Sequence, residues 1–162
     1  MRCLNSAAFS LPNRIESLRR AVIYLGLDAI KSWATIVAFS NINTSPPSEL
    51  LTTALVRAKM AELIAPTFNC DPETAFTLGL FSVTDALFNK SMTELLSPLP
   101  LSDTLKLALQ NAEGPLGKLL MFIRTHERGS LTVMPSSLSI PEINQAFLSA
   151  TEWANHSLET IK

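Results

Sequence analysis

The chain has 162 residues, of which 47% are hydrophobic and 17% are charged, and its formal net charge at pH 7 is −1. This length fits one domain or most of one, and the near-neutral charge argues against a nucleic-acid-binding domain, which is usually distinctly basic. The mean hydropathy is +0.24, yet no run approaches the roughly 18 uninterrupted apolar residues that a membrane-spanning helix needs. The apolar surplus is therefore expected to be buried inside the domain, against a partner, or against a segment that the chain lacks.

The N-terminal sequence and the cysteines predict a cytoplasmic protein. No charged leader with an apolar core and a cleavage site opens the chain, so no secretory signal is expected. Cys3 and Cys70 are the two cysteines, and two cysteines at this spacing make no disulfide framework, which favours a reducing compartment.

The first third of the chain carries the punctuation of helices joined by loops. Ser17 and Asp28 are typical N-cap residues and predict short helices over about 17–24 and 28–39. Pro46-Pro47 indicates a loop. The spacing of apolar residues then predicts a long amphipathic helix over 49–68.

The most apolar stretch follows Asp71-Pro72-Glu73. An acidic cap, a proline at the first helical position and an acid in the first turn together predict a helix start. The helix is expected to run as one piece to about Phe88, over roughly 25 Å. Because it is apolar on nearly every side, it is predicted to be the central, buried helix. The side chains expected to hold the core are Phe76, Phe81, Val83 and Leu87.

Serines in helix-capping positions divide the rest of the chain. Ser91, Ser102 and Ser139 each precede a helical pattern. Gly114-Pro115 breaks the chain before another amphipathic helix over 116–127. No hairpin signal or internal repeat is evident, so the expected fold is all-α.

A series of motifs runs through the first 128 residues: LNSAAF at 4–9, RIESLRRAV at 14–22, Leu25-Gly26, Arg57-Ala58, the stretch 75–88, MTELL at 92–96 and LPLS at 99–102. Together they resemble the signature of the HDOD domain, an HD-related output domain of bacterial signalling proteins. The later motifs resemble the subgroup in which an EAL domain precedes the HDOD domain. The resemblance implies an HD-superfamily-like bundle of about seven to nine helices, usually without a metal site.

The resemblance also locates the degenerate metal position. Gly79-Leu80-Phe81 corresponds to the residues that often precede the His-Asp pair of HD phosphohydrolases, so Ser82 and Val83 stand where the metal ligands would be. A hydroxyl beside an isopropyl group does not hold a divalent metal. Asp85 lies two positions beyond and is interpreted as a cap or hydrogen-bonding residue, with a surviving metal ligand as the alternative. No catalytic residue, metal or cofactor is therefore expected, and the chain is predicted not to be an enzyme.

Two departures from the family concern the extent of the chain. The family domain usually begins some tens of residues before the Asn-Ser-Ala motif, which here starts at Asn5. The sequence also contains no EAL domain. Residues 1–162 are therefore interpreted as a single HDOD-like domain that lacks its first helices.

The expected function is that of a non-catalytic bacterial signalling module that acts through protein–protein contacts, with cyclic di-GMP signalling suggested by the resemblance. The expected partner is a protein or an upstream EAL or sensor domain, and a homodimer through exposed apolar surface is a further expectation. Arg14, Arg19 and Arg20 form a basic cluster that is read as a partner contact or, more simply, as a solvated helix face. Arg124 and Arg128 form a second basic pair.

Two alternatives stay open. One is a degenerate HD-type metal-dependent phosphohydrolase that acts on nucleotides or cyclic di-GMP. The other is a small-nucleotide sensor that binds in the cleft left by the lost metal site.

Overall fold

The structure is a computed structural model that describes residues 48–97, 101–130 and 135–159. Within these ranges every regular element is a helix, which confirms the all-α prediction. The elements are α2 (Ser48–Ile64), the 3-10 helix η1 (Ala65–Phe68), α3 (Pro72–Phe81), α4 (Thr84–Phe88), α5 (Met92–Leu96), α6 (Asp103–Asn111), α7 (Gly114–Glu127) and α8 (Ile140–Glu159). The helices predicted over 17–24 and 28–39 lie outside the described residues.

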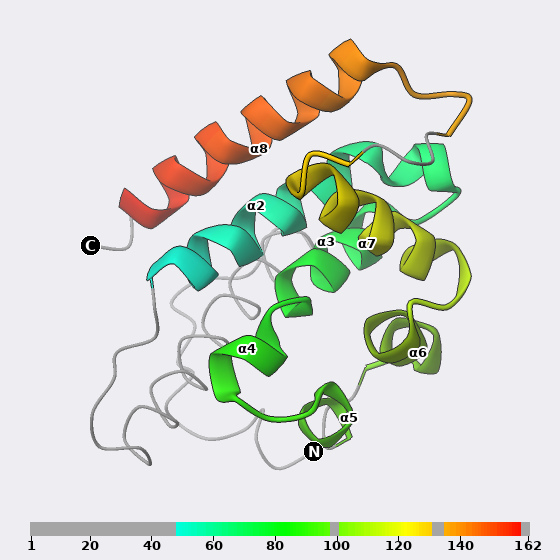
Figure 1. The fold of residues 1–162 in the computed structure, drawn as a ribbon, viewed down its shortest axis with the longest axis vertical. Coiled ribbons are helices and arrows are strands. Elements are labelled where there is room, and N and C mark those ends of the chain that lie inside the picture. Colours follow the sequence, from blue (N-terminus) through cyan, green and yellow to red (C-terminus); the bar gives the residue numbers. More distant parts are fainter. Residues whose placement is uncertain (1–47, 98–100, 131–134, 160–162) are drawn as a thin grey trace, which may run out of the picture.

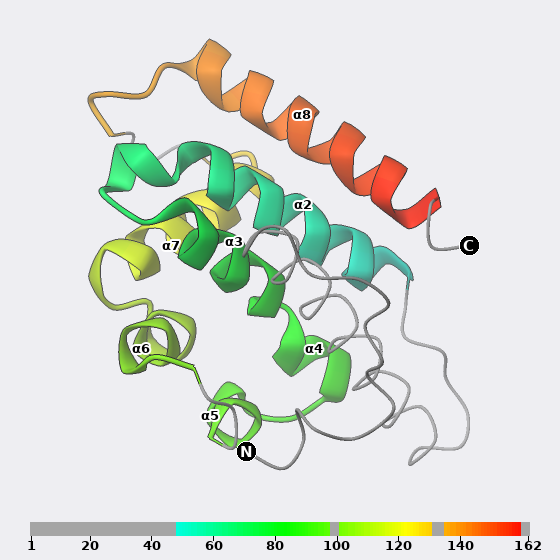
Figure 2. The ribbon, with the colours of Figure 1, turned by 180° about the vertical axis from the view of Figure 1, so that it is seen from behind.

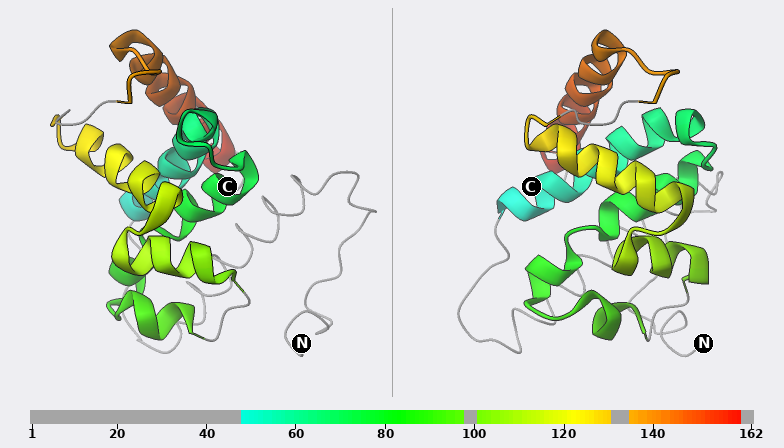
Figure 3. Two further views of the ribbon diagram at one scale, coloured as in Figure 1. Left: turned by 90° about the vertical axis from the view of Figure 1, so that its right-hand side faces the viewer. Right: turned by 45° about the vertical axis from the view of Figure 1, so that its right-hand side comes forward.

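Helix α2 lies in the middle of the arrangement. It packs mainly against α3 and α8, while α6 packs against α7. Figures 1 and 2 show α8 running along α2, with α3 on the side of α2 that faces away from α8. Figure 3 shows α5 and α6 at the opposite end of the bundle from α8.

Two clusters of buried apolar residues hold these helices together. The larger one joins α2, α3, α6, α7 and α8, and its fully buried side chains include Met60, Leu78, Leu119, Leu120, Ile123 and Ile143. The smaller one lies where α2, α3 and α8 meet, and it includes Leu55, Phe76, Leu80, Val83 and Ala154. Trp153 of α8 packs at the edge of this smaller cluster. Its ring lies edge-on to the ring of Phe76, at an interplanar angle of 87°, and the Lys59 ammonium lies 5.7 Å from the centroid of the Trp153 ring. Burial of this kind is the main term that stabilises a helical bundle.

The predicted helix starts are confirmed at four positions. Ser91 Oγ and Ser102 Oγ each accept a hydrogen bond from the backbone N–H three residues on. Ser139 and Glu142 form a reciprocal capping box at the start of α8. Asp71 accepts hydrogen bonds from the backbone N–H and the hydroxyl of Thr74, both at 2.8 Å. These bonds satisfy N–H groups that the first turn of a helix leaves without partners.

Replacing this acidic cap gives a pH-dependent prediction. The two Thr74 donors lower the pKa of Asp71 from its ordinary value. The cap therefore stabilises the fold above the unfolded-state pKa, and that contribution disappears as the pH falls through the lower folded-state pKa. Asp71→Ala is expected to lower the free energy of unfolding by about 1 kcal/mol at pH 7. Urea unfolding of both proteins at pH 7 and at acid pH checks this, and a difference that stays constant with pH would refute it.

The long central helix predicted over 72–88 is broken in two. Helix α3 ends at Phe81 with Ser82 as its C-cap, and α4 begins after Val83, whose φ of −114° and ψ of 2° are not helical. The hydroxyl of Ser82 donates to the Gly79 carbonyl at 2.7 Å, and Arg124 Nη2 donates to the Ser82 carbonyl at 2.9 Å. Side-chain bonds of this kind compete with the helical ladder, so the helix ends where a serine and a distant arginine take over its backbone groups.

Candidate functional site

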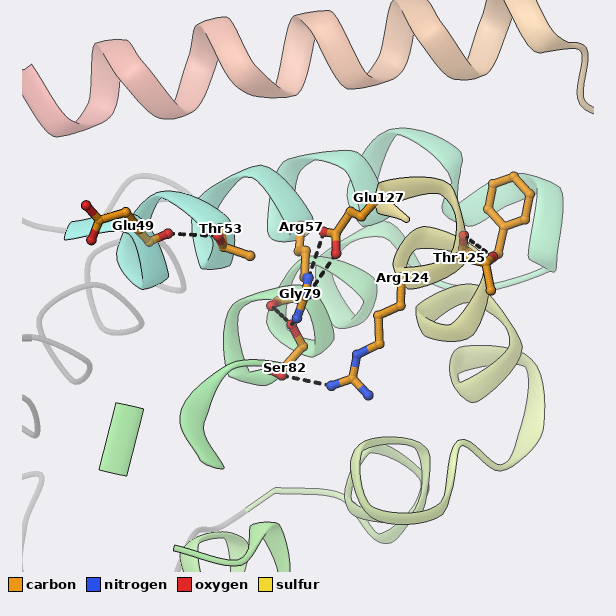
Figure 4. A network of polar contacts seen from close by, with 9 residues as sticks. Glu49, Thr53, Arg57, Gly79, Ser82, Arg124, Thr125 and Glu127 are labelled. Carbon is orange, nitrogen blue, oxygen red and sulfur yellow. Dashed lines mark hydrogen bonds and ion pairs between the residues drawn. The ribbon is translucent and has the colours of Figure 1, made fainter. Parts of the chain in front are cut away.

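The break between α3 and α4 lies within a polar network that joins three helices. Arg57 of α2 donates from Nη1 to Ser82 Oγ at 3.2 Å. From α7, Arg124 donates to the Ser82 carbonyl, so both arginines converge on the same serine. Figure 4 shows Arg57 reaching Ser82 from above and Arg124 reaching it from the right, with Glu127 beside Arg57. Ser82, which the resemblance places at the first metal-ligand position, is therefore contacted by two guanidinium groups.

Arg57 is fully engaged in this network. Its Nε and Nη2 donate to the two carboxylate oxygens of Glu127, each at 2.7 Å. The two side chains keep only 15% and 23% of their surface exposed. A bidentate arginine–carboxylate pair with this much shielding is stronger than an ordinary surface ion pair. It fixes α2 to α7 and leaves no donor edge of Arg57 unused.

Arg124 is in a different electrostatic position. Its side chain is half-buried, and both burial and the charge of Arg57 lower its pKa, while Asp85 and Glu127 act in the opposite direction. Arg128 adds another positive charge nearby. Two of the charged groups that act on Arg124 are positive, Arg57 and Arg128, and two are negative, Asp85 and Glu127.

The structure places the three residues of the predicted degenerate site in different surroundings. Ser82 is buried, with 1% exposed, and belongs to the polar network. Val83 is also buried, but its side chain belongs to the smaller apolar cluster. Asp85 is exposed in the first turn of α4, where its Oδ1 accepts from the backbone N–H of Ala86 at 2.9 Å.

The described residues bring no metal-ligand cluster together. Within 48–97, 101–130 and 135–159 no group of three His, Cys, Asp or Glu side chains could hold a metal ion. The ring of His126 packs against Phe147 of α8, with centroids 5.5 Å apart, and its Nδ1 is buried without a hydrogen-bond partner. The proposed contacts Arg14, Arg19 and Arg20 lie outside the described residues, and their role stays a prediction.

The sequence reasoning missed three members of the network. Arg57 appeared only as part of a family motif, Arg124 only as one of a basic pair, and Glu127 only as the last residue of the helix predicted over 116–127. The available signal was the motif at Arg57, since a partly buried arginine on a helix that packs against several others needs a partner. That partner is 70 positions away, and sequence spacing does not locate it.

The helical bundle with this site defines an HD-like helical domain. The family model of the HDOD domain matches residues 1–97, and the chain belongs to this family. The finer assignment to the EAL-linked subgroup and the absence of first helices stay predictions.

Two curated relatives match almost the whole chain. The cyclic di-GMP phosphodiesterase CdgJ of Vibrio cholerae is 32% identical over 161 residues, which cover 95% of this chain and 37% of CdgJ. The uncharacterized protein YuxH of Bacillus subtilis is 29% identical over 166 residues, which cover 98% of this chain and 41% of YuxH. The chain thus spans well under half the length of these relatives. No solved structure matches.

The first relative corrects one prediction. The chain was expected not to be an enzyme, because Ser82 and Val83 were interpreted as replacing a metal-binding pair, but CdgJ is named a phosphodiesterase. The prediction was wrong because it extended the chemistry of a single position to the whole protein.

In the described part of the chain, no helix is long and apolar enough to cross a membrane.

Proposed function

We propose that the chain works in cyclic di-GMP signalling as the HDOD part of a protein that hydrolyses cyclic di-GMP. The observation that carries this proposal is the 32% identity to CdgJ across 95% of the chain. Because the chain corresponds to 37% of CdgJ, the rest of such a protein would contribute further elements, for which an EAL or sensor domain is the proposed partner.

The proposed mechanism is regulation by contact. A partner that binds one packing of the bundle better than another shifts the equilibrium between them, and the same coupling changes the activity of the partner. Large apolar side chains that are exposed on the described helices offer surface for such contacts, with a second copy of the chain as one candidate partner: Leu63, Leu107, Met121, Ile140 and Leu148.

A second candidate function is hydrolysis by the chain itself, as an HD-type phosphohydrolase. The name of CdgJ favours it. The two candidates differ in whether the purified chain alone turns over cyclic di-GMP, so one set of experiments separates them.

The proposal predicts an effect on cellular cyclic di-GMP. When the chain is produced in a bacterium that makes cyclic di-GMP, the extracted nucleotide measured by mass spectrometry is expected to fall several-fold relative to an empty vector. Purified chain is then incubated with cyclic di-GMP and Mg²⁺ or Mn²⁺. Turnover by the chain alone would identify it as the phosphohydrolase, whereas a fall in cells without turnover would indicate action on another protein.

The control is the same chain carrying Gly79→Ala, a change that is expected to disrupt the fold. This variant should no longer lower the cellular cyclic di-GMP level. An unchanged cellular level, together with no turnover by a chain that circular dichroism shows to be helical, would refute the proposed function.

A further inference from the structure

The two arginines at Ser82 differ in how many of their donors are used. All three nitrogens of Arg57 donate within the network, two to Glu127 and one to Ser82 Oγ. Arg124 donates through Nη2 alone, to the Ser82 carbonyl, in the part of the chain that the structure describes. The Nε and Nη1 of Arg124 remain as donors for a ligand, because an arginine carries five N–H groups in a planar fork.

The charge balance around Arg124 favours an anion. Half-burial removes part of the water that would stabilise the guanidinium, and the Arg57 charge works against it as well. Asp85 and Glu127 compensate only in part, since Glu127 is bonded to Arg57 and Asp85 is bonded to its own helix. An anion that met the free edge of Arg124 would replace lost hydration with charge-assisted hydrogen bonds. A divalent cation, in contrast, would be repelled.

The guanidinium is also held in position before any ligand arrives. Its anchor, the Ser82 carbonyl, belongs to a residue that is 1% exposed and is itself fixed by bonds to Gly79 and Arg57. A donor that is already oriented loses less conformational entropy on binding than a free surface arginine does. Nη2 uses one of its two N–H groups for the Ser82 carbonyl, so one edge of the fork, made by its second N–H together with Nε or Nη1, can still meet two oxygens of a phosphate group.

We infer that Arg124 binds a phosphodiester group of cyclic di-GMP at the position where Ser82 replaces the first metal ligand. The ligand class in this inference rests on the proposed function, whereas the anion preference rests on the geometry and charges of Arg57, Ser82 and Arg124. In this site two guanidinium groups stand in place of the metal-binding pair. Arg57 supports Ser82, and Arg124 contacts the ligand.

The test is isothermal titration of cyclic di-GMP into the wild-type chain and into Arg124→Gln. A hydrogen bond to a charged group contributes about 1.5–3 kcal/mol, so the dissociation constant is expected to rise about tenfold to hundredfold in Arg124→Gln. Arg124→Lys keeps the charge but not the fork, and its affinity is expected to lie between the two. The matched control is Arg128→Gln, which removes a nearby exposed charge without touching Ser82 and should change the affinity less than about threefold.

Circular dichroism and thermal unfolding of each variant test whether the chain still folds when the Ser82 carbonyl loses its hydrogen-bond donor. Should Arg124→Gln fail to fold, Arg124→Lys carries the comparison. The inference is overturned if wild-type chain does not bind cyclic di-GMP, or if a folded Arg124 variant binds it as well as wild type does. A cellular cyclic di-GMP level that still falls in those cases would keep the proposed function and remove only this site.

Discussion

The variant Gly79→Ala is expected to lose about 3 kcal/mol or more of its free energy of unfolding, because a methyl group has no room at the contact between α2 and α3. A Cβ at Gly79 would lie 2.5 Å from the backbone N and Cα of Ala58 and from the carbonyl carbon of Arg57. Backbone atoms cannot rotate away as a side chain can, so the two helices would have to separate. Urea denaturation followed by circular dichroism measures the change.

The matched control is Gly129→Ala, the same substitution at a glycine with open space around it. Nothing lies within 4 Å of the added Cβ there, and only the positive φ of 70° opposes it, which costs about 1–2 kcal/mol. Equal losses at both positions would show that the close packing of α2 and α3 is not the cause. Because Arg57 is part of that contact, separation of the helices would also move it away from Ser82.

How far the sequence predicts this fold depends on how local each signal is. The caps at Asp71, Ser91, Ser102 and Ser139 were predicted because the donor and the acceptor lie within one turn of each other. The break at Ser82 was not predicted, since the apolar pattern on both sides favours one continuous helix. It depends on Arg57 and Arg124, which are 25 and 42 positions from Ser82.

The sequence singled out Ser82 but not the polar network around it. The interpretation of Ser82 and Val83 as a lost metal-binding pair came from the family motifs and from residue types alone, and it stays a prediction. The replacement chemistry needs the fold, because α2 and α7 meet at Ser82 only after the bundle has closed. Local patterns therefore gave the helices and their starts, whereas the contacts between helices decided where one of them ends and what surrounds its last residue.

Val83→Asp, which returns a carboxylate to the degenerate position, is expected to lower the free energy of unfolding by about 3–5 kcal/mol at neutral pH. Val83 is 3% exposed and lies in the apolar cluster with Leu55, Phe76 and Leu80, so the new charge would be buried without a partner. Burial raises the pKa of such a carboxyl group in the folded state. The loss of stability is therefore expected to be smaller below the unfolded-state pKa and to grow as the pH rises towards the raised folded-state pKa.

Ala86→Asp is the matched control, because it adds the same carboxylate at an exposed position in the first turn of α4. An acid near a helix N-terminus is favourable or neutral, so its stability should stay within about 0.5 kcal/mol of wild type. Urea unfolding at neutral and acid pH, with elemental analysis after incubation with Mn²⁺, compares the two variants. If Val83→Asp kept wild-type stability and took up Mn²⁺, then the side chain at position 83 would face a metal-binding site, and its assignment to the apolar cluster would be wrong. If it loses stability as expected without taking up Mn²⁺, then the side chain at position 83 serves the apolar core.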